Sequence, residues 1–142
     1  MAATLDRTPF GAIHPFHAVL LAGTVPLFLG ALLSDYAYWS SYQIQWANFA
    51  SWLIVGGLVF GGGALLCAVI GLFRSDRRGG RRLAYTLLML ATWVLGFIDA
   101  LVHAKDAWAI MPMGLVLSVI VAVLACAATW MGFSTLSAGG TR

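Results

Sequence analysis

Charged residues are scarce in this chain. Only 9% of its 142 residues are Asp, Glu, Lys or Arg, whereas 61% are hydrophobic and the mean hydropathy is +0.91. A water-soluble domain of this length keeps much of its surface exposed and has no room inside for so many apolar side chains. The composition therefore excludes a soluble domain and indicates that lipid is the solvent for most of the protein.

Cysteines are few, and catalytic motifs are lacking. Cys67 and Cys126 lie in apolar runs without a partner at metal-ligand spacing, so we interpret them as small hydrophobic residues. The chain has no Walker loop, no nucleophile elbow and no zinc-protease motif. We therefore expect no catalytic residues and no metal site, and a protein that is not an enzyme on its own.

Most of the positive charge lies in one short loop, residues 74–82, which holds five of the eight Lys and Arg residues. An arginine at the centre of a membrane helix costs roughly 2.5–3.5 kcal/mol, so this loop must stay in water, and short basic loops stay cytoplasmic. Basic residues confined to one loop indicate contact with lipid headgroups rather than with nucleic acid. The arginines concerned are Arg74, Arg77, Arg78, Arg81 and Arg82.

Four apolar runs flank this loop, two before it and two after it. Each has about the ~20 residues that cross a bilayer as a helix. Counting crossings from the cytoplasmic loop places both termini in the cytoplasm. The sequence thus predicts an all-α integral membrane protein, a four-helix transmembrane bundle that crosses the membrane several times and forms one domain over residues 1–142. The predicted spans lie near residues 13–33, 49–73, 83–102 and 110–133.

The first span and the stretch after it carry two further signals. Pro26 lies inside the first span and predicts a kink there. The next stretch, residues 34–48, is rich in tyrosine and tryptophan, including Trp39 and Trp46. Such rings favour the headgroup level, so we expect an interfacial segment on the outer side that contributes to a partner interface.

Small residues form a stripe on the second span. Such a stripe lets another helix backbone approach closely. Packing within this chain is one interpretation, and a homo-oligomer or docking against another membrane protein is the other. The stripe consists of Gly57, Gly61, Ala64 and Ala68.

Two histidines, His14 and His17, open the first span at i and i+3 and share a helix face. Two imidazoles at this spacing can hold one ion from a single side or relay a proton. They can equally cap the helix start or bond to a neighbouring loop.

Asp99 and His103 are spaced i and i+4 near the outer end of the third span. An aspartate that accepts the N–H of a histidine often orients a haem or metal ligand, and the same pair also makes a buried carboxylate tolerable. Met111 or Met113 offers a His/Met pair for haem. His14, His17, Asp99 and His103 are therefore the candidate cofactor-binding residues, for haem b or a quinone, although neither is favoured. A bis-histidine haem in one chain is not expected, because about 30 Å of hydrocarbon separates the inner and outer histidines.

Several features occur together along the chain, namely His14-Pro15 opening the first span, Pro26, Asp35 at its end, and Trp130-Met131-Gly132 closing the fourth. In these features the chain resembles a bacterial four-helix membrane family catalogued as domain of unknown function 2231. The resemblance covers nearly the whole chain. It implies an inner-membrane location and an accessory or anchor role beside periplasmic dehydrogenases and other redox or respiratory proteins.

Within this resemblance the matching residues are His14, Pro15 and Asp35. Phe73-Arg74 stands where an acidic residue is expected near the end of the second span. No enzymatic activity follows from the resemblance.

Three functions remain open. The leading hypothesis is a non-catalytic accessory or anchor subunit of a larger redox or respiratory membrane complex. The second is a haem- or quinone-binding electron-transfer protein. The third is a small ion or proton transporter with Asp35 and Asp99 as polar gates, although the usual pointer to a transporter is a pair of matching broken helices and only Pro26 breaks one here.

Overall fold

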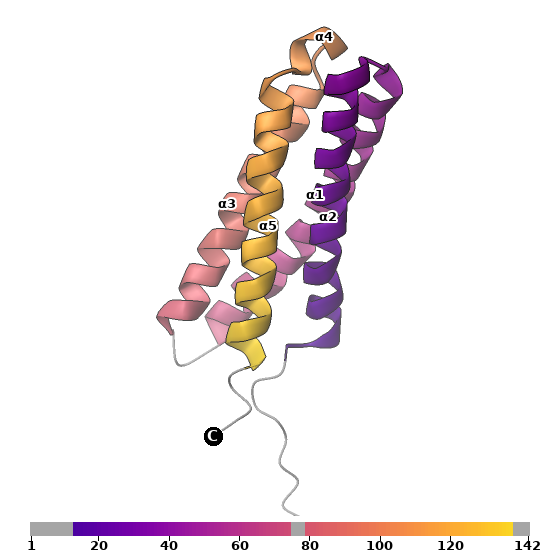
Figure 1. The fold of residues 1–142 in the computed structure, drawn as a ribbon. Helices are drawn as coiled ribbons and strands as arrows, with labels where there is room; N and C mark the ends of the chain where they lie inside the picture. Colours follow the sequence, from indigo (N-terminus) through magenta and orange to yellow (C-terminus); the bar gives the residue numbers. More distant parts are fainter. Residues whose placement is uncertain (1–12, 75–78, 138–142) are drawn as a thin grey trace, which may run out of the picture.

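The computed structural model describes residues 13–74 and 79–137, and this part of the chain is helical, without a β-strand. Four long helices run up and down the molecule, and one short helix lies between the last two (Figure 1). The helices are α1 (Pro15–Ser41), α2 (Ile44–Arg74), α3 (Gly80–His103), α4 (Ala107–Ile110) and α5 (Met113–Ser137). The predicted all-α bundle is confirmed.

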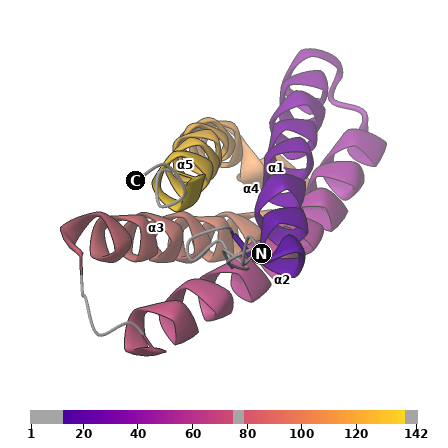
Figure 2. The ribbon, with the colours of Figure 1, turned by 90° about the horizontal axis from the view of Figure 1, so that it is seen from below.

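The four long helices are arranged in a ring (Figure 2). Helix α1 packs against α2 and α5, and α3 packs against the same two neighbours, so that α1 and α3 face each other across the bundle axis. Because the helices alternate in direction, α1 and α3 both end where α4 lies (Figure 1). We call this the α4 end and the opposite end, where α2 ends and α3 begins, the arginine end.

The four long helices have the length and apolar composition of membrane spans. Large apolar side chains such as Trp52, Val59, Leu66 and Trp130 point away from the bundle and are exposed. In water this surface would be costly, whereas in a bilayer it faces lipid tails. The prediction of four spans is confirmed by the four helices of the described residues.

The helices extend further than the predicted spans at the α4 end. Helix α1 continues to Ser41, and only Tyr42 and Gln43 separate it from α2. Tyr42 has a left-handed backbone (φ 54°), and its N–H donates to the carbonyl of Tyr38, which closes the helix. Most of the predicted interfacial segment is therefore helical. Trp39 and Trp46 are still partly exposed near the α4 end, as headgroup-level rings require.

The small-residue stripe of α2 packs inside the chain. A Cβ added at Gly57 would lie 2.7 Å from the ring of Phe28, and one at Gly61 would touch Thr24 and Trp93. Ala64 and Ala68 are buried too. The stripe thus brings α2 close to α1 and α3, which favours internal packing over a free docking face.

The bundle core contains apolar layers between the two ends. Phe28, Val121 and Ala125 are buried together with Leu95 against them. Another apolar cluster, which includes Leu21, Met89 and Ala128, lies toward the arginine end. These layers separate the buried polar groups of one end from those of the other.

Candidate functional site

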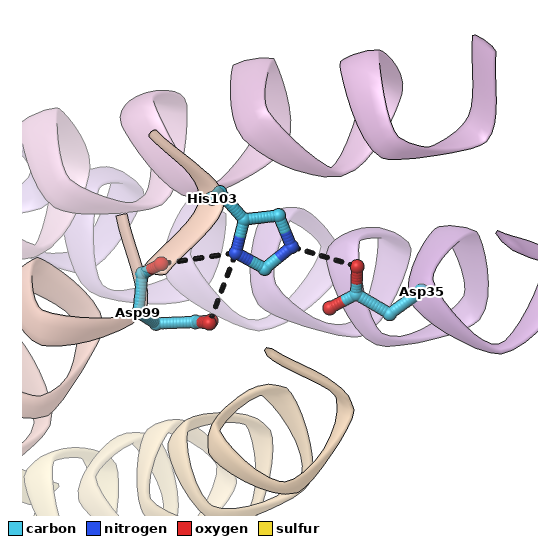
Figure 3. A group of neighbouring side chains, drawn as sticks. All are labelled: Asp35, Asp99 and His103. Atoms are coloured by element: carbon cyan, nitrogen blue, oxygen red, sulfur yellow. Dashed lines mark hydrogen bonds and ion pairs between the residues drawn. The ribbon is translucent and has the colours of Figure 1, made fainter. Parts of the chain in front are cut away.

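A group of buried polar side chains lies near the α4 end of the bundle. Asp35 comes from α1, Asp99 and His103 from α3, and Ser118 from α5. Each is at most 7% exposed, and Asp35 is not exposed at all. We call these four residues the acidic cluster, and Figure 3 shows three of them.

The helix directions explain why the residues of the acidic cluster meet. Asp35 lies near the end of α1, and His103 is the last residue of α3, so both belong to the α4 end. Asp99 lies one turn before His103 on the same face of α3, because residues spaced i and i+4 are neighbours. Ser118 follows the start of α5 by little more than one turn.

The imidazole of His103 lies between the two carboxyl groups (Figure 3). Its Nε2 is 2.8 Å from Oδ1 of Asp35. Its Nδ1 donates to the backbone carbonyl of Asp99 over 2.9 Å, because a carbonyl oxygen only accepts. Ser118 Oγ contacts Oδ2 of Asp35 and lies 3.2 Å from Oδ2 of Asp99. The cluster thus ties α1, α3 and α5 together.

The acidic cluster has few hydrogen-bond donors for its two carboxyl groups. The Nδ1–H of His103 donates to a carbonyl, and the hydroxyl of Ser118 contacts one oxygen of each carboxyl group. Because buried carboxyl groups without partners are costly in an apolar surrounding, these few contacts matter to the cluster.

One oxygen of the cluster remains without a hydrogen bond. Oδ1 of Asp99 is fully buried and has no hydrogen-bond donor among the residues that the structure describes. His103 Nδ1 lies 3.2 Å away, but its hydrogen points to the backbone carbonyl at the shorter distance, so only charge attraction acts on Oδ1. A buried acceptor without a donor is costly, and a cation or donor group bound at this atom would remove that cost.

A polar pocket of about 260 Å³ lies beside the acidic cluster at the α4 end, and His103 is the member of the cluster that lines it. Lys105 and Asp106 are exposed at its walls, whereas the side chain of His103 is only 1% exposed. The lining residues come from the start of α2, the end of α3 and α4, and they are Ile44, Ala47, Asn48, Ser51, His103, Lys105, Asp106, Ala107 and Ile110.

The surroundings of His103 leave no spare room on the side of α5. A Cβ added at Gly114 would come within 2.6 Å of Ile110 and 3.1 Å of the imidazole Cε1. On the side of α1, the hydroxyl of Tyr38 donates to the carbonyl of Ala107 over 3.0 Å. Glycine at position 114 therefore makes the space in which the imidazole lies, and Tyr38 holds α4 over it.

The arginine end holds a second, smaller polar contact. His17 Nε2 and the hydroxyl of Tyr85 are 2.9 Å apart, and both side chains are buried. They line a pocket of about 120 Å³ together with Cys67 and Arg82. Unlike the acidic cluster, this pair includes no carboxyl group.

The candidate residues of the sequence analysis divide between these places. Asp99 and His103 meet as the spacing predicts, and Asp35 joins them. His14 is exposed, and its Nδ1 accepts from the N–H of Phe16, so it caps α1, whereas His17 turns inward. The histidines of α1 and α3 thus belong to opposite ends.

Methionine and arginine candidates lie elsewhere. Met111 packs in the apolar cluster of Tyr38 and Ile110, and Met113 is exposed. Of the arginines, Arg74, Arg81 and Arg82 are exposed at the arginine end. Arg77 and Arg78 lie outside the described residues.

Sequence reasoning does not identify two of the polar residues at these places, Ser118 and Tyr85. Each is a single polar residue in an apolar span and looks like an ordinary core residue in the sequence. The contact of Asp35 with His103 did have a signal, since alternate helices of an up-and-down bundle run the same way and bring the ends of the first and third spans to the same side.

The fold and composition define a multi-pass membrane protein with a buried acidic cluster. In a comparison with known families, residues 13–140 match the family described as a predicted membrane protein (DUF2231), and the chain belongs to this family. Neither the curated proteins nor the solved structures gave a match. The predicted resemblance is therefore confirmed.

Proposed function

We propose that this protein is a small cation transporter of the bacterial cytoplasmic membrane, and that the acidic cluster is its ion site. The observation that carries the proposal is the meeting of two carboxyl groups and one imidazole inside an apolar bundle, within 4.8 Å of one another. Ionisable side chains in membrane helices are costly, and they commonly mark ion or proton pathways.

A purely structural role explains the cluster less well. Replacing a buried ion pair by apolar side chains of similar volume is often neutral or stabilising, so stability alone does not require these residues. Among the residues that the structure describes, Asp99 Oδ1 also has no hydrogen-bond donor, whereas a purely structural hydrogen-bond network favours satisfied groups. Both points favour a site that exchanges its contents.

The pocket at the α4 end gives the direction of entry. Its lining includes the exposed residues Lys105 and Asp106 and one residue of the acidic cluster, His103. If the arginine end stays in the cytoplasm, as the loop of basic residues favours, the pocket opens to the outside. The cation then enters from the outer water phase.

The accessory role expected from the family resemblance needs a surface that docks onto a partner. Of the residues expected to supply it, Gly57 and Gly61 already pack within the same chain, whereas Trp39 and Trp46 are partly exposed. For the electron-transfer role, His103 has no second histidine at its end of the bundle, because His14 and His17 lie at the arginine end. The acidic cluster therefore supports the transporter better than either alternative.

Flux measurements in liposomes test the proposal. Purified protein is reconstituted into liposomes that contain a pH-sensitive or a metal-sensitive dye, and ion gradients are applied. We expect cation flux above that of empty liposomes, abolished in Asp99→Asn and retained in His14→Gln, which changes an exposed imidazole at the arginine end. Wild-type liposomes that carry neither protons nor divalent cations would contradict the proposed function.

A further inference from the structure

We propose that the acidic cluster binds a divalent transition-metal cation of the Mn²⁺, Fe²⁺ or Zn²⁺ class, with Asp35, Asp99 and His103 as its ligands. This inference deepens the proposed function, on which it rests only in treating the cluster as an exchangeable ion site. It concerns the nature of the ion and is tested without transport.

The kinds of ligand select the class of metal. Carboxylate oxygens alone suit Mg²⁺, Ca²⁺ and Mn²⁺, whereas an imidazole nitrogen shifts preference toward transition metals. Thiolates, which favour Cu⁺, are not part of the cluster, since its four members are two aspartates, one histidine and one serine. A mixed oxygen and nitrogen set is suited to divalent first-row ions.

The distances suit such an ion. Metal–ligand bonds of about 2.0–2.2 Å place neighbouring ligands of a tetrahedral ion roughly 3.4 Å apart. One ligand atom from each of Asp35, Asp99 and His103 already lies within 4.8 Å of the other two. Small side-chain rotations therefore bring the three ligands around one cation, which replaces the contact of 2.8 Å between His103 and Asp35.

The charge of the cluster matches two positive charges. Two carboxylates and one neutral imidazole carry −2, and a divalent cation makes the site neutral. Because a buried net charge is costly, this match favours a divalent over a monovalent ion.

The unbonded oxygen points to the same conclusion independently. Asp99 is 1% exposed, and its Oδ1 has no hydrogen-bond donor among residues 13–74 and 79–137. A cation between the carboxyl groups gives this oxygen a partner. The pocket of about 260 Å³ that His103 lines lies beside the site, with Asn48, Ser51 and Asp106 as oxygen-bearing side chains along it.

Cobalt spectroscopy tests the site directly. Co²⁺ is titrated into the detergent-purified full chain, with Cys67 and Cys126 replaced by alanine so that no thiolate competes. We expect saturation at one Co²⁺ per chain, with visible d–d absorption bands that Zn²⁺ abolishes by displacement. Absence of saturable bands would overturn the inference.

Variants locate the bound ion. Asp35→Asn and His103→Gln keep the side-chain volume and should each abolish the bands, whereas His17→Gln, which alters the histidine at the arginine end, should leave them unchanged. Bands that persist in Asp35→Asn or vanish in His17→Gln would place the metal elsewhere and overturn the assignment. Should the two cluster variants fail to fold, Mn²⁺ bound to the cysteine-free chain is examined by electron paramagnetic resonance, and imidazole nitrogen hyperfine coupling supports the site, whereas its absence contradicts it.

The two proposals fail in different ways. Proton flux in liposomes without Co²⁺ binding in detergent would overturn the metal site and leave the transporter. Saturable Co²⁺ binding without any flux would overturn the transporter and leave the metal site.

Discussion

The two ends of the bundle each bury one histidine, in contrasting surroundings. At the α4 end, His103 lies between Asp35 and Asp99, and the cluster connects three helices. At the arginine end, the one side-chain hydrogen bond of His17 among the described residues is with the hydroxyl of Tyr85. One buried imidazole thus lies between two carboxyl groups, whereas the other meets a phenol.

The largest loss of stability is expected when a carboxyl group of the acidic cluster is removed. Asp35→Ala leaves the Nε2 of His103 without its partner and removes one of the two carboxyl contacts of Ser118, and breaking a buried pair costs about 3–5 kcal/mol. We expect the free energy of unfolding, measured in mixed detergent micelles by circular dichroism, to fall by about that amount. A loss no larger than that of a single neutral hydrogen bond would remove the distinction between the two ends.

The space around His103 gives the next largest effect. Gly114→Ala adds a methyl group within 2.6 Å of Ile110 and 3.1 Å of the imidazole, and overpacking of this kind costs about 1–3 kcal/mol. The matched control is Gly71→Ala in α2, because a Cβ there meets nothing within 4 Å. That change should be neutral or slightly stabilising, since alanine favours helix more than glycine does. Equal losses in both variants would show that the imidazole is not confined.

A smaller effect is expected at the arginine end. Tyr85→Phe removes the hydroxyl that bonds to His17 and keeps the ring, which packs near Leu21 and Met89. The loss should be about 1 kcal/mol, the usual contribution of a neutral hydrogen bond. The same unfolding measurement serves here, and a loss as large as that of Asp35→Ala would make the two ends equivalent.

The two ends of the bundle should also differ in the water phase that each one faces. In a chain without its native cysteines, a cysteine at Gly79 should react with a membrane-impermeant thiol reagent only after the membrane is opened. A cysteine at Trp108, which is 83% exposed at the α4 end, should react from outside. The reverse pattern would turn the pocket toward the cytoplasm and overturn the predicted direction of entry.

Much of the fold was predictable from the sequence, because length and hydropathy suffice to locate four spans. The residues at which α1 and α2 end and begin at the α4 end were less predictable. Tyrosine and tryptophan at residues 34–48 indicate the interface, but they do not reveal that α1 and α2 continue through it and turn at Tyr42 and Gln43. The turn depends on one left-handed residue, Tyr42, of a type that rarely adopts this conformation.

The site was predictable in part. Spacing alone pairs Asp99 with His103, since both lie on one helix. Asp35 and Ser118 join them from other helices, and spacing within one helix says nothing about which faces meet across a bundle. The ring order of α1, α2, α3 and α5 decides that meeting, and it depends on contacts such as Gly57 against Phe28 that become visible only in three dimensions.

The distribution of the acidic cluster over α1, α3 and α5 also bears on how the chain is made. Asp35 enters the membrane with the first helix, long before the ribosome has added His103, and Ser118 arrives later still. Until then its carboxyl group has none of these partners, and an unpaired aspartate in a membrane helix is costly. Synthesis of the third helix relieves this cost, so insertion of the early helices is completed by the later ones.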